Sequence, residues 1–184
     1  MEVPSCPAPF NLAAHALHHA SDLGDKPALE IMHADRTEVW SYAQIEAAVR
    51  GIGTGLLGLG LAPGSRILLR LGNSAAFPLA YLGAIAAGFV PVPTAAALTE
   101  AEITRMAALV APALVVADAG IALPDCVAPV LPAADLMAMQ HLAPCDYQMG
   151  DPDRLAYIVF TSGTSGRALA VQHAHRALLD DHAA

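Results

Sequence analysis

The chain has little that would indicate a disulfide framework, a zinc site or a nucleic-acid partner. Its 184 residues include three cysteines, Cys6, Cys126 and Cys145, which lie far apart and form no C-x-x-C pair. Lysine and arginine number 9 against 17 acidic residues, and no basic cluster occurs, which argues against nucleic acid. No signal peptide is visible at the N-terminus. Because the cysteine spacing indicates no disulfide framework, a reducing compartment fits, and we expect a cytoplasmic protein.

Charge is absent from a long stretch, residues 71–99. This length could span a bilayer. However, Pro78, Pro91 and Pro93 interrupt it, and the segment around Pro91 is typical of extended chain rather than helix. A buried helix followed by a buried strand accounts for the same residues, so we predict no membrane partner.

Apolar runs alternate with amphipathic segments through the middle of the chain. We predict strands at 66–71, 89–92 and 113–117, and helices at 74–87 and 99–110. Strands that are apolar on both faces indicate an α/β fold, a parallel βαβαβ sheet with helices on both faces and right-handed crossovers.

The preceding segment predicts a helix at 10–20 capped by Asn11, strands at 28–32 and 37–40, and a helix from Ser41 to a stop at Gly60. Ser41-x-x-Gln44 is a capping box, as is the Thr99-x-x-Glu102 pattern of the later helix. Four glycines between residues 51 and 58 each weaken the helix by about 1 kcal/mol, so we expect close packing onto the sheet to compensate.

A proline-rich region at 120–153 predicts a connection with one short helix at 133–140. We therefore divide the chain into residues 1–150, an α/β unit with its connection, and residues 151–184. The second part begins a further unit with a strand at 157–160, a polar loop and another strand at 168–171. A helix is expected from 173 to 182.

The polar loop is the candidate phosphate-binding site. Its glycines allow backbone N–H groups to approach a polyanion, and its hydroxyls add small donors. The loop lacks the lysine and glycine spacing of a Walker A motif, and it is not a dinucleotide-binding G-x-G-x-x-G. The alternative interpretation is a simple turn between two strands. The candidate residues are Thr161, Ser162, Gly163, Thr164, Ser165, Gly166 and Arg167.

This loop, after a strand that contains Tyr157, resembles the signature of the adenylate-forming superfamily, which includes the AMP-forming acyl-CoA synthetases. The segments 40–45 and 60–67 also resemble that family, so the likeness covers nearly the whole chain and corresponds to the leading third of such enzymes. One position departs from the family pattern. The family's Pro-Lys-Gly is Ala168-Leu169-Ala170, so Leu169 stands where the family has lysine.

The resemblance implies ATP, Mg²⁺ and CoA as cofactors, and an aromatic or fatty carboxylic acid as substrate. The acid would be activated to an acyl-adenylate and then joined to CoA, with the loop holding the β- and γ-phosphates. The family's catalytic residues lie beyond this stretch, so we expect no catalytic residue here and an inactive chain that self-associates. The alternative is a noncatalytic nucleotide- or protein-binding module derived from the same family.

Histidines suggest two further hypotheses. A face made by His15, His18, His19 and Asp22 has helical spacing that could hold a metal, although a solvated polar face is more common, and we predict no metal site. Two histidines after the loop, at 173 and 175, could contact phosphate or the acyl pocket, or could simply pack where the next helix begins.

Overall fold

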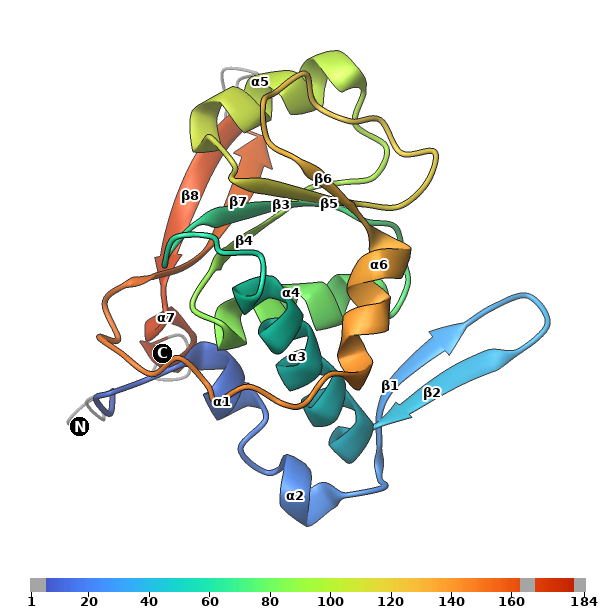
Figure 1. Cartoon of the computed structure of the whole chain (residues 1–184), viewed down its shortest axis with the longest axis vertical. Helices are drawn as coiled ribbons and strands as arrows, with labels where there is room; N and C mark the ends of the chain where they lie inside the picture. Colours follow the sequence, from blue (N-terminus) through green and yellow to red (C-terminus); the bar gives the residue numbers. More distant parts are fainter. Residues whose placement is uncertain (1–5, 163–167, 181–184) are drawn as a thin grey trace.

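A four-stranded parallel sheet forms the centre of the computed structural model, which describes residues 6–162 and 168–180 (Figure 1). The sheet has the order β4-β3-β5-β6, made by β3 (Arg66–Arg70), β4 (Val90–Pro93), β5 (Leu114–Ala117) and β6 (Val130–Pro132). The predicted parallel βαβαβ core is therefore confirmed. β6 was not predicted, because prolines on and beside this three-residue strand hide its pattern.

Helices cover both faces of the sheet, as predicted. On one face lie the helices α1 (Leu12–Ala16), α3 (Tyr42–Leu57), α4 (Ala76–Ala86) and α6 (Ala133–Ala138). On the other face lies α5 (Glu100–Val110). The strands are buried on both sides: Ile67 and Leu69 of β3 face the first layer, and Leu68 faces the second. This double burial explains the uninterrupted apolar pattern of the strands.

The N-terminal segment forms two short helices, α1 (Leu12–Ala16) and α2 (Ala20–Leu23), so the prediction of one helix at 10–20 was wrong. The chain leaves helical geometry at Leu17, with φ −106° and ψ 9°, and the helix restarts at Ala20. The predicted cap is confirmed, since the Asn11 side chain accepts hydrogen bonds from the backbone N–H groups of Ala13 and Ala14. A hairpin of β1 (Pro27–Met32) and β2 (Thr37–Ser41) follows, as predicted.

Both predicted capping boxes are present, at Ser41–Gln44 and Thr99–Glu102. The glycines of α3 do allow a close approach, but the partner is not the sheet. A Cβ on Gly51 would lie 2.6 Å from the carbonyl oxygen of Gln140, which belongs to the short 3₁₀ helix η1 (Met139–His141). The sequence pattern could not show this partner, because η1 lies far from α3 along the chain.

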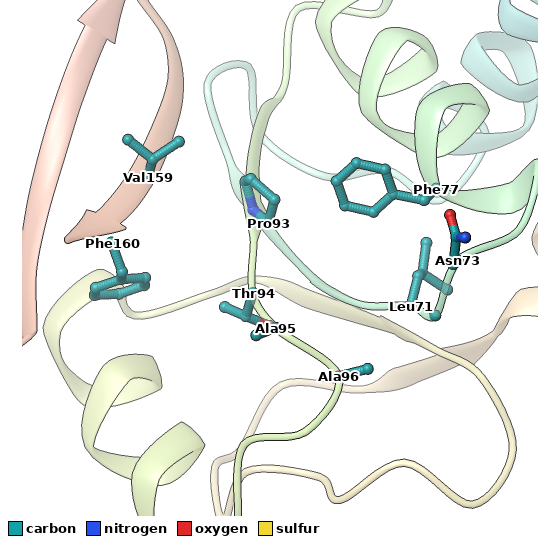
Figure 2. Close-up of a pocket in the computed structure, with 10 residues that line it drawn as sticks. Leu71, Asn73, Phe77, Pro93, Thr94, Ala95, Ala96, Val159 and Phe160 are labelled. Atoms are coloured by element: carbon teal, nitrogen blue, oxygen red, sulfur yellow. The ribbon is translucent and has the colours of Figure 1, made fainter. Parts of the chain in front are cut away.

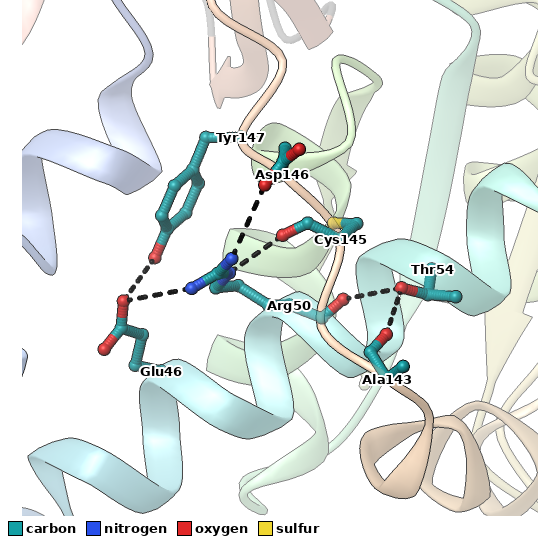
Figure 3. A network of polar contacts seen from close by, with 7 residues as sticks. All are labelled: Glu46, Arg50, Thr54, Ala143, Cys145, Asp146 and Tyr147. Carbon is teal, nitrogen blue, oxygen red and sulfur yellow. Dashed lines mark hydrogen bonds and ion pairs between the residues drawn. The ribbon is translucent and has the colours of Figure 1, made fainter.

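The predicted short helix in the 120–153 connection is confirmed as α6 (Ala133–Ala138), which continues into η1. The chain that follows is fastened to α3 by Arg50 and by Thr54, whose hydroxyl donates to the Ala143 carbonyl at 2.6 Å (Figure 3). Arg50 Nε donates to the Cys145 carbonyl at 2.8 Å and pairs with Glu46 and Asp146 at 3.7 and 3.8 Å. Tyr147 stacks beside the guanidinium, and burial, with Glu46 nearby, raises the pKa of Tyr147 to about 12.

The charge-free stretch 71–99 contributes α4 and β4 to the interior. Among the described residues, no helix combines the length and apolar character needed to cross a membrane.

Candidate functional site

The polar loop lies at the tip of an antiparallel hairpin formed by β7 (Leu155–Ser162) and β8 (Ala168–Ala174). Ser162 pairs with Ala168, so the two strands hold the ends of the loop together. Of the predicted phosphate-binding residues, Thr161 and the backbone of Ser162 are described, and Gly163, Thr164, Ser165, Gly166 and Arg167 lie outside the described residues. Thr161 is exposed at the end of β7, where a hydroxyl can meet a ligand.

Leu169 lies directly opposite Thr161 in the hairpin register and is 55% exposed. Opposed residues of an antiparallel pair project from the same face of the sheet. A side chain at position 169 is therefore a neighbour of the Thr161 hydroxyl. The leucine gives this position an apolar surface and no charge.

A cavity of about 500 Å³ lies beside the end of β7, where the carboxyl ends of β3 and β4 also meet (Figure 2). Ligands of doubly wound α/β folds bind outside the carboxyl ends of the strands. Figure 2 shows Phe77 of α4 and Phe160 of β7 on opposite sides of the chain that leaves β4. The lining residues are Leu71, Gly72, Asn73, Phe77, Pro93, Thr94, Ala95, Ala96, Val159 and Phe160.

A buried arginine supports one wall of this cavity. Arg70 ends β3, is 0% exposed, and directs its guanidinium at the loops that follow β4 and β5. Burial lowers the pKa of the guanidinium. Its hydrogen bonds go to the carbonyl oxygens of Ala122 (2.9 Å), Ala95 (2.6 Å), Ala96 (3.3 Å) and Leu98 (3.1 Å), and to the Thr94 hydroxyl (3.2 Å).

Sequence reasoning missed Arg70. The available signal was its position: it is the charged residue that ends an otherwise apolar run, next to the charge-free stretch. Five acceptors from two loops converge on it, so it fixes the backbone of residues 94–98, part of which lines the cavity.

An aromatic row joins the cavity to the hairpin. The ring centroids of Phe77 and Tyr81 are 6.5 Å apart, those of Tyr81 and Tyr157 are 5.7 Å apart, and those of Tyr157 and His173 are 4.6 Å apart. Burial, with Tyr157 nearby, raises the pKa of Tyr81, so its phenol stays neutral. The row packs the hairpin against α4.

The two histidines after the loop occupy packing positions. His173 lies in β8 and stacks on Tyr157, and His175 is 1% exposed and accepts a hydrogen bond from the Leu12 backbone. The predicted helix start at 173 was wrong, because β8 runs to Ala174 and α7 (Ala177–Asp180) begins later. Strand pairing with β7 continues through this segment and prevents the helix from beginning there.

The N-terminal histidine face holds no metal-ligand cluster. Throughout residues 6–162 and 168–180, no three His, Cys, Asp or Glu side chains are grouped so that they could hold a metal. His19 Nδ1 lies 3.4 Å from Asp22 Oδ2, with both side chains largely exposed, as a solvated polar face would have it.

The chain belongs to the AMP-binding enzyme family, whose model matches residues 17–184. Among curated proteins, it is 33% identical over 170 residues to p-hydroxybenzoic acid–AMP ligase FadD22 of Mycobacterium tuberculosis. This match covers 90% of this chain and 23% of that protein. It is 29% identical over 179 residues to 3-hydroxybenzoate–CoA/4-hydroxybenzoate–CoA ligase of Thauera aromatica, covering 87% of this chain and 34% of the ligase.

The fold is shared with solved structures. The N-terminal subdomain of Klebsiella oxytoca NpsA superimposes with a TM-score of 0.80 at 20% identity, covering 93% of this chain and 44% of that one. The chain thus spans about a third or less of the two curated relatives. The resemblance to the adenylate-forming superfamily is confirmed, and the chain corresponds to the N-terminal part of its members.

Proposed function

We propose that this chain supplies the leading α/β unit and the phosphate loop of an AMP-forming acid–CoA ligase. In the proposed reaction, a carboxylate oxygen attacks the α-phosphorus of ATP, the bond to the β-phosphate oxygen breaks, and pyrophosphate leaves with the bonding electrons. The thiol sulfur of CoA then attacks the acyl carbon, losing its proton, and AMP leaves.

The observation that carries this proposal is the placement of the two strands that flank the loop. The register of β7 and β8 joins its two ends at Ser162 and Ala168, and the end of β7 borders the cavity at the carboxyl edge of the sheet. A loop of glycines and hydroxyls there can hold a polyphosphate by N–H and O–H donors, with Mg²⁺ neutralising part of its charge. The chain's part is to position the leaving pyrophosphate, which supplies rate by orientation and charge stabilisation.

The acid is proposed to be aromatic or fatty. Two relatives are named for hydroxybenzoates, and a structural neighbour of similar fold is a fatty acyl-adenylate ligase. Residues that hold adenine, ribose and acid are expected outside these 184 residues, so we propose that the chain by itself forms no acyl-adenylate.

A noncatalytic binding module is the second candidate, and one observation favours it. Position 169, beside Thr161, carries an exposed leucine in place of the lysine that the resemblance leads us to expect there. A coding sequence that continues past Ala184 into adenine- and ribose-binding motifs favours the ligase, and a stop codon there favours the module.

Binding and turnover by the 184-residue chain test the proposal. We expect magnesium pyrophosphate to shift the backbone amide signal of Thr161 with a millimolar Kd, about −4 kcal/mol. The amide of Leu68, in the buried strand β3, should not move. Thr161→Val should weaken binding because it removes the hydroxyl and keeps the shape, and Thr37→Val, on the exposed β1–β2 hairpin, is the matched control.

Two results would contradict this assignment. The absence of any Thr161 shift at tens of millimolar pyrophosphate would mean that the loop does not bind phosphate. Pyrophosphate exchange that depends on benzoate, 4-hydroxybenzoate or dodecanoate would mean that the chain alone is a complete enzyme.

A further inference from the structure

The N-terminal segment crosses the base of the hairpin and is tied to it at several points. The backbone N–H of Leu12 donates to His175 Nδ1 at 3.0 Å, and the backbone N–H of His175 donates to the Arg154 carbonyl at 3.1 Å. Arg154 Nη1 in turn donates to the Phe10 carbonyl at 2.7 Å. Phe10 and Gly150 exchange backbone hydrogen bonds of 2.8 and 3.2 Å. Figure 1 shows α1 and α7 next to each other at this junction.

The contact with Leu12 fixes the protonation state of His175. A backbone N–H can only donate, so Nδ1 must carry a lone pair, and the imidazole is neutral with its proton on Nε2. A second proton would set two N–H groups against each other and place a buried cation beside Arg154. Water cannot relieve this repulsion, since His175 is 1% exposed.

We propose that His175 is a positioning residue whose neutral imidazole latches the base of the β7–β8 hairpin to the N-terminal segment, and that protonation releases this latch. The latch concerns the hairpin itself; its consequence for phosphate binding rests on the proposed function. Nothing in the loop has to titrate for the hairpin to respond to pH.

The electrostatic surroundings agree with a latch that is closed at neutral pH. Burial, and to a lesser extent Arg154, lower the pKa of His175 from 6.5 to about 4. Other charged or titratable groups on the elements around it include His15 of α1, His173 of β8, Asp180 of α7, Asp151, and the ion pair of Asp153 with Arg176 at 2.8 Å. That ion pair lies at the surface, with both side chains about half exposed, so its field at His175 is screened by water.

The sign of the pH effect follows from the lowered pKa. The neutral form is favoured in the latched state, so the latch has its full strength above pH 6.5 and loses it as the pH falls toward 4. Between pH 7.5 and pH 5, the population of the released state should rise by about 30-fold, given these two pKa values.

Amide hydrogen exchange on the complete chain tests the latch. After correction for intrinsic exchange rates, we expect protection of the β7–β8 amides and of the Leu12 amide to fall by about 30-fold between pH 7.5 and pH 5. Protection at Leu68 in the central strand β3 should stay unchanged, which distinguishes release of the hairpin from global unfolding.

Substitutions at His175 distinguish the effect of its protonation from the effect of losing its hydrogen-bond acceptor. His175→Asn places an amide oxygen near the position of Nδ1 and cannot titrate in this range, so the hairpin should keep its protection at pH 5. His175→Leu has no acceptor and should show low protection at both pH values. His141→Asn, at an exposed histidine of η1, should behave as the wild type.

The result that overturns the latch is hairpin protection that does not change with pH in the wild type, or that still changes in His175→Asn. Magnesium pyrophosphate binding at Thr161, measured in the same samples, is a separate readout. A pH-dependent hairpin without pyrophosphate binding leaves the latch standing and refutes the proposed function. Pyrophosphate binding with a pH-independent hairpin refutes the latch and leaves the proposed function standing.

Discussion

Replacing Arg70 by methionine should destabilise the chain by about 3 kcal/mol. Five acceptors from two loops lose their donor, each with a net cost of roughly 1 kcal/mol. The desolvation penalty of the buried charge disappears with it, which offsets about 2 kcal/mol of this loss. The methionine fills much of the volume, so the loss reflects hydrogen bonding more than a cavity. The perturbed segment is 94–98, part of which lines the cavity, together with the loop after β5.

Urea unfolding, followed by Trp40 fluorescence and by far-ultraviolet circular dichroism, measures this loss. Arg36→Met is the matched control, because Arg36 is 64% exposed and its contact with Asp35 is long, at 3.4 Å. Its effect should stay within about 0.5 kcal/mol. Arg70→Lys, which keeps the charge but not the planar fork, should fall between the two. An Arg70→Met protein as stable as the control would refute the role given to the guanidinium.

Three other predictions concern the glycine contacts and the hairpin. Gly51→Ala should destabilise the chain by about 2 kcal/mol and Gly55→Ala by less, because the added Cβ at 51 meets the backbone of η1, whereas the one at 55 meets a methionine side chain. Urea unfolding measures both losses, and equal losses would contradict this. Leu169→Lys should tighten magnesium pyrophosphate binding about 5-fold at low salt, because it places a positive charge beside Thr161. NMR titration should show that this gain is lost at about 1 M salt and does not occur in Leu169→Met. Self-association is expected through β8, because Leu169 and Val171 are exposed there and its outer edge has no strand neighbour among the described residues. Sedimentation should detect this association and show that Leu169→Lys weakens it; a protein that stays monomeric at high concentration would contradict the prediction.

The central fold could be predicted because its signals are local. Capping side chains at Ser41 and Thr99 mark helix starts, and apolar runs between turn residues mark the strands. The misplaced elements were decided by contacts distant in sequence. β6 forms because it pairs with β5 despite Pro132, and the strand through His173 is extended by its pairing with β7.

The candidate site was predictable in its motif and not in its surroundings. The loop residues form one continuous signature, and both Thr161 and Leu169 stand at its ends in the hairpin. Arg70 and His175 act through backbone groups of other segments, which a sequence does not display as partners. Phosphate binding by residues 161–167 and the division of the chain at residue 150 stay predictions.

The segment that runs from η1 to β7 has a fixed length, because Arg50 of α3 is one of several anchors that hold it along its path. It is held at Ala143 by the Thr54 hydroxyl, at Cys145 by Arg50, and at Gln148 by the buried amide of Asn11. An added or deleted residue there would shift every later anchor, including the base of the hairpin. We expect an insertion to be tolerated instead around Val127, which is fully exposed between β5 and β6. A fluorescent label or an inserted peptide belongs at that position, where it leaves the spacing between the sheet and the phosphate loop intact.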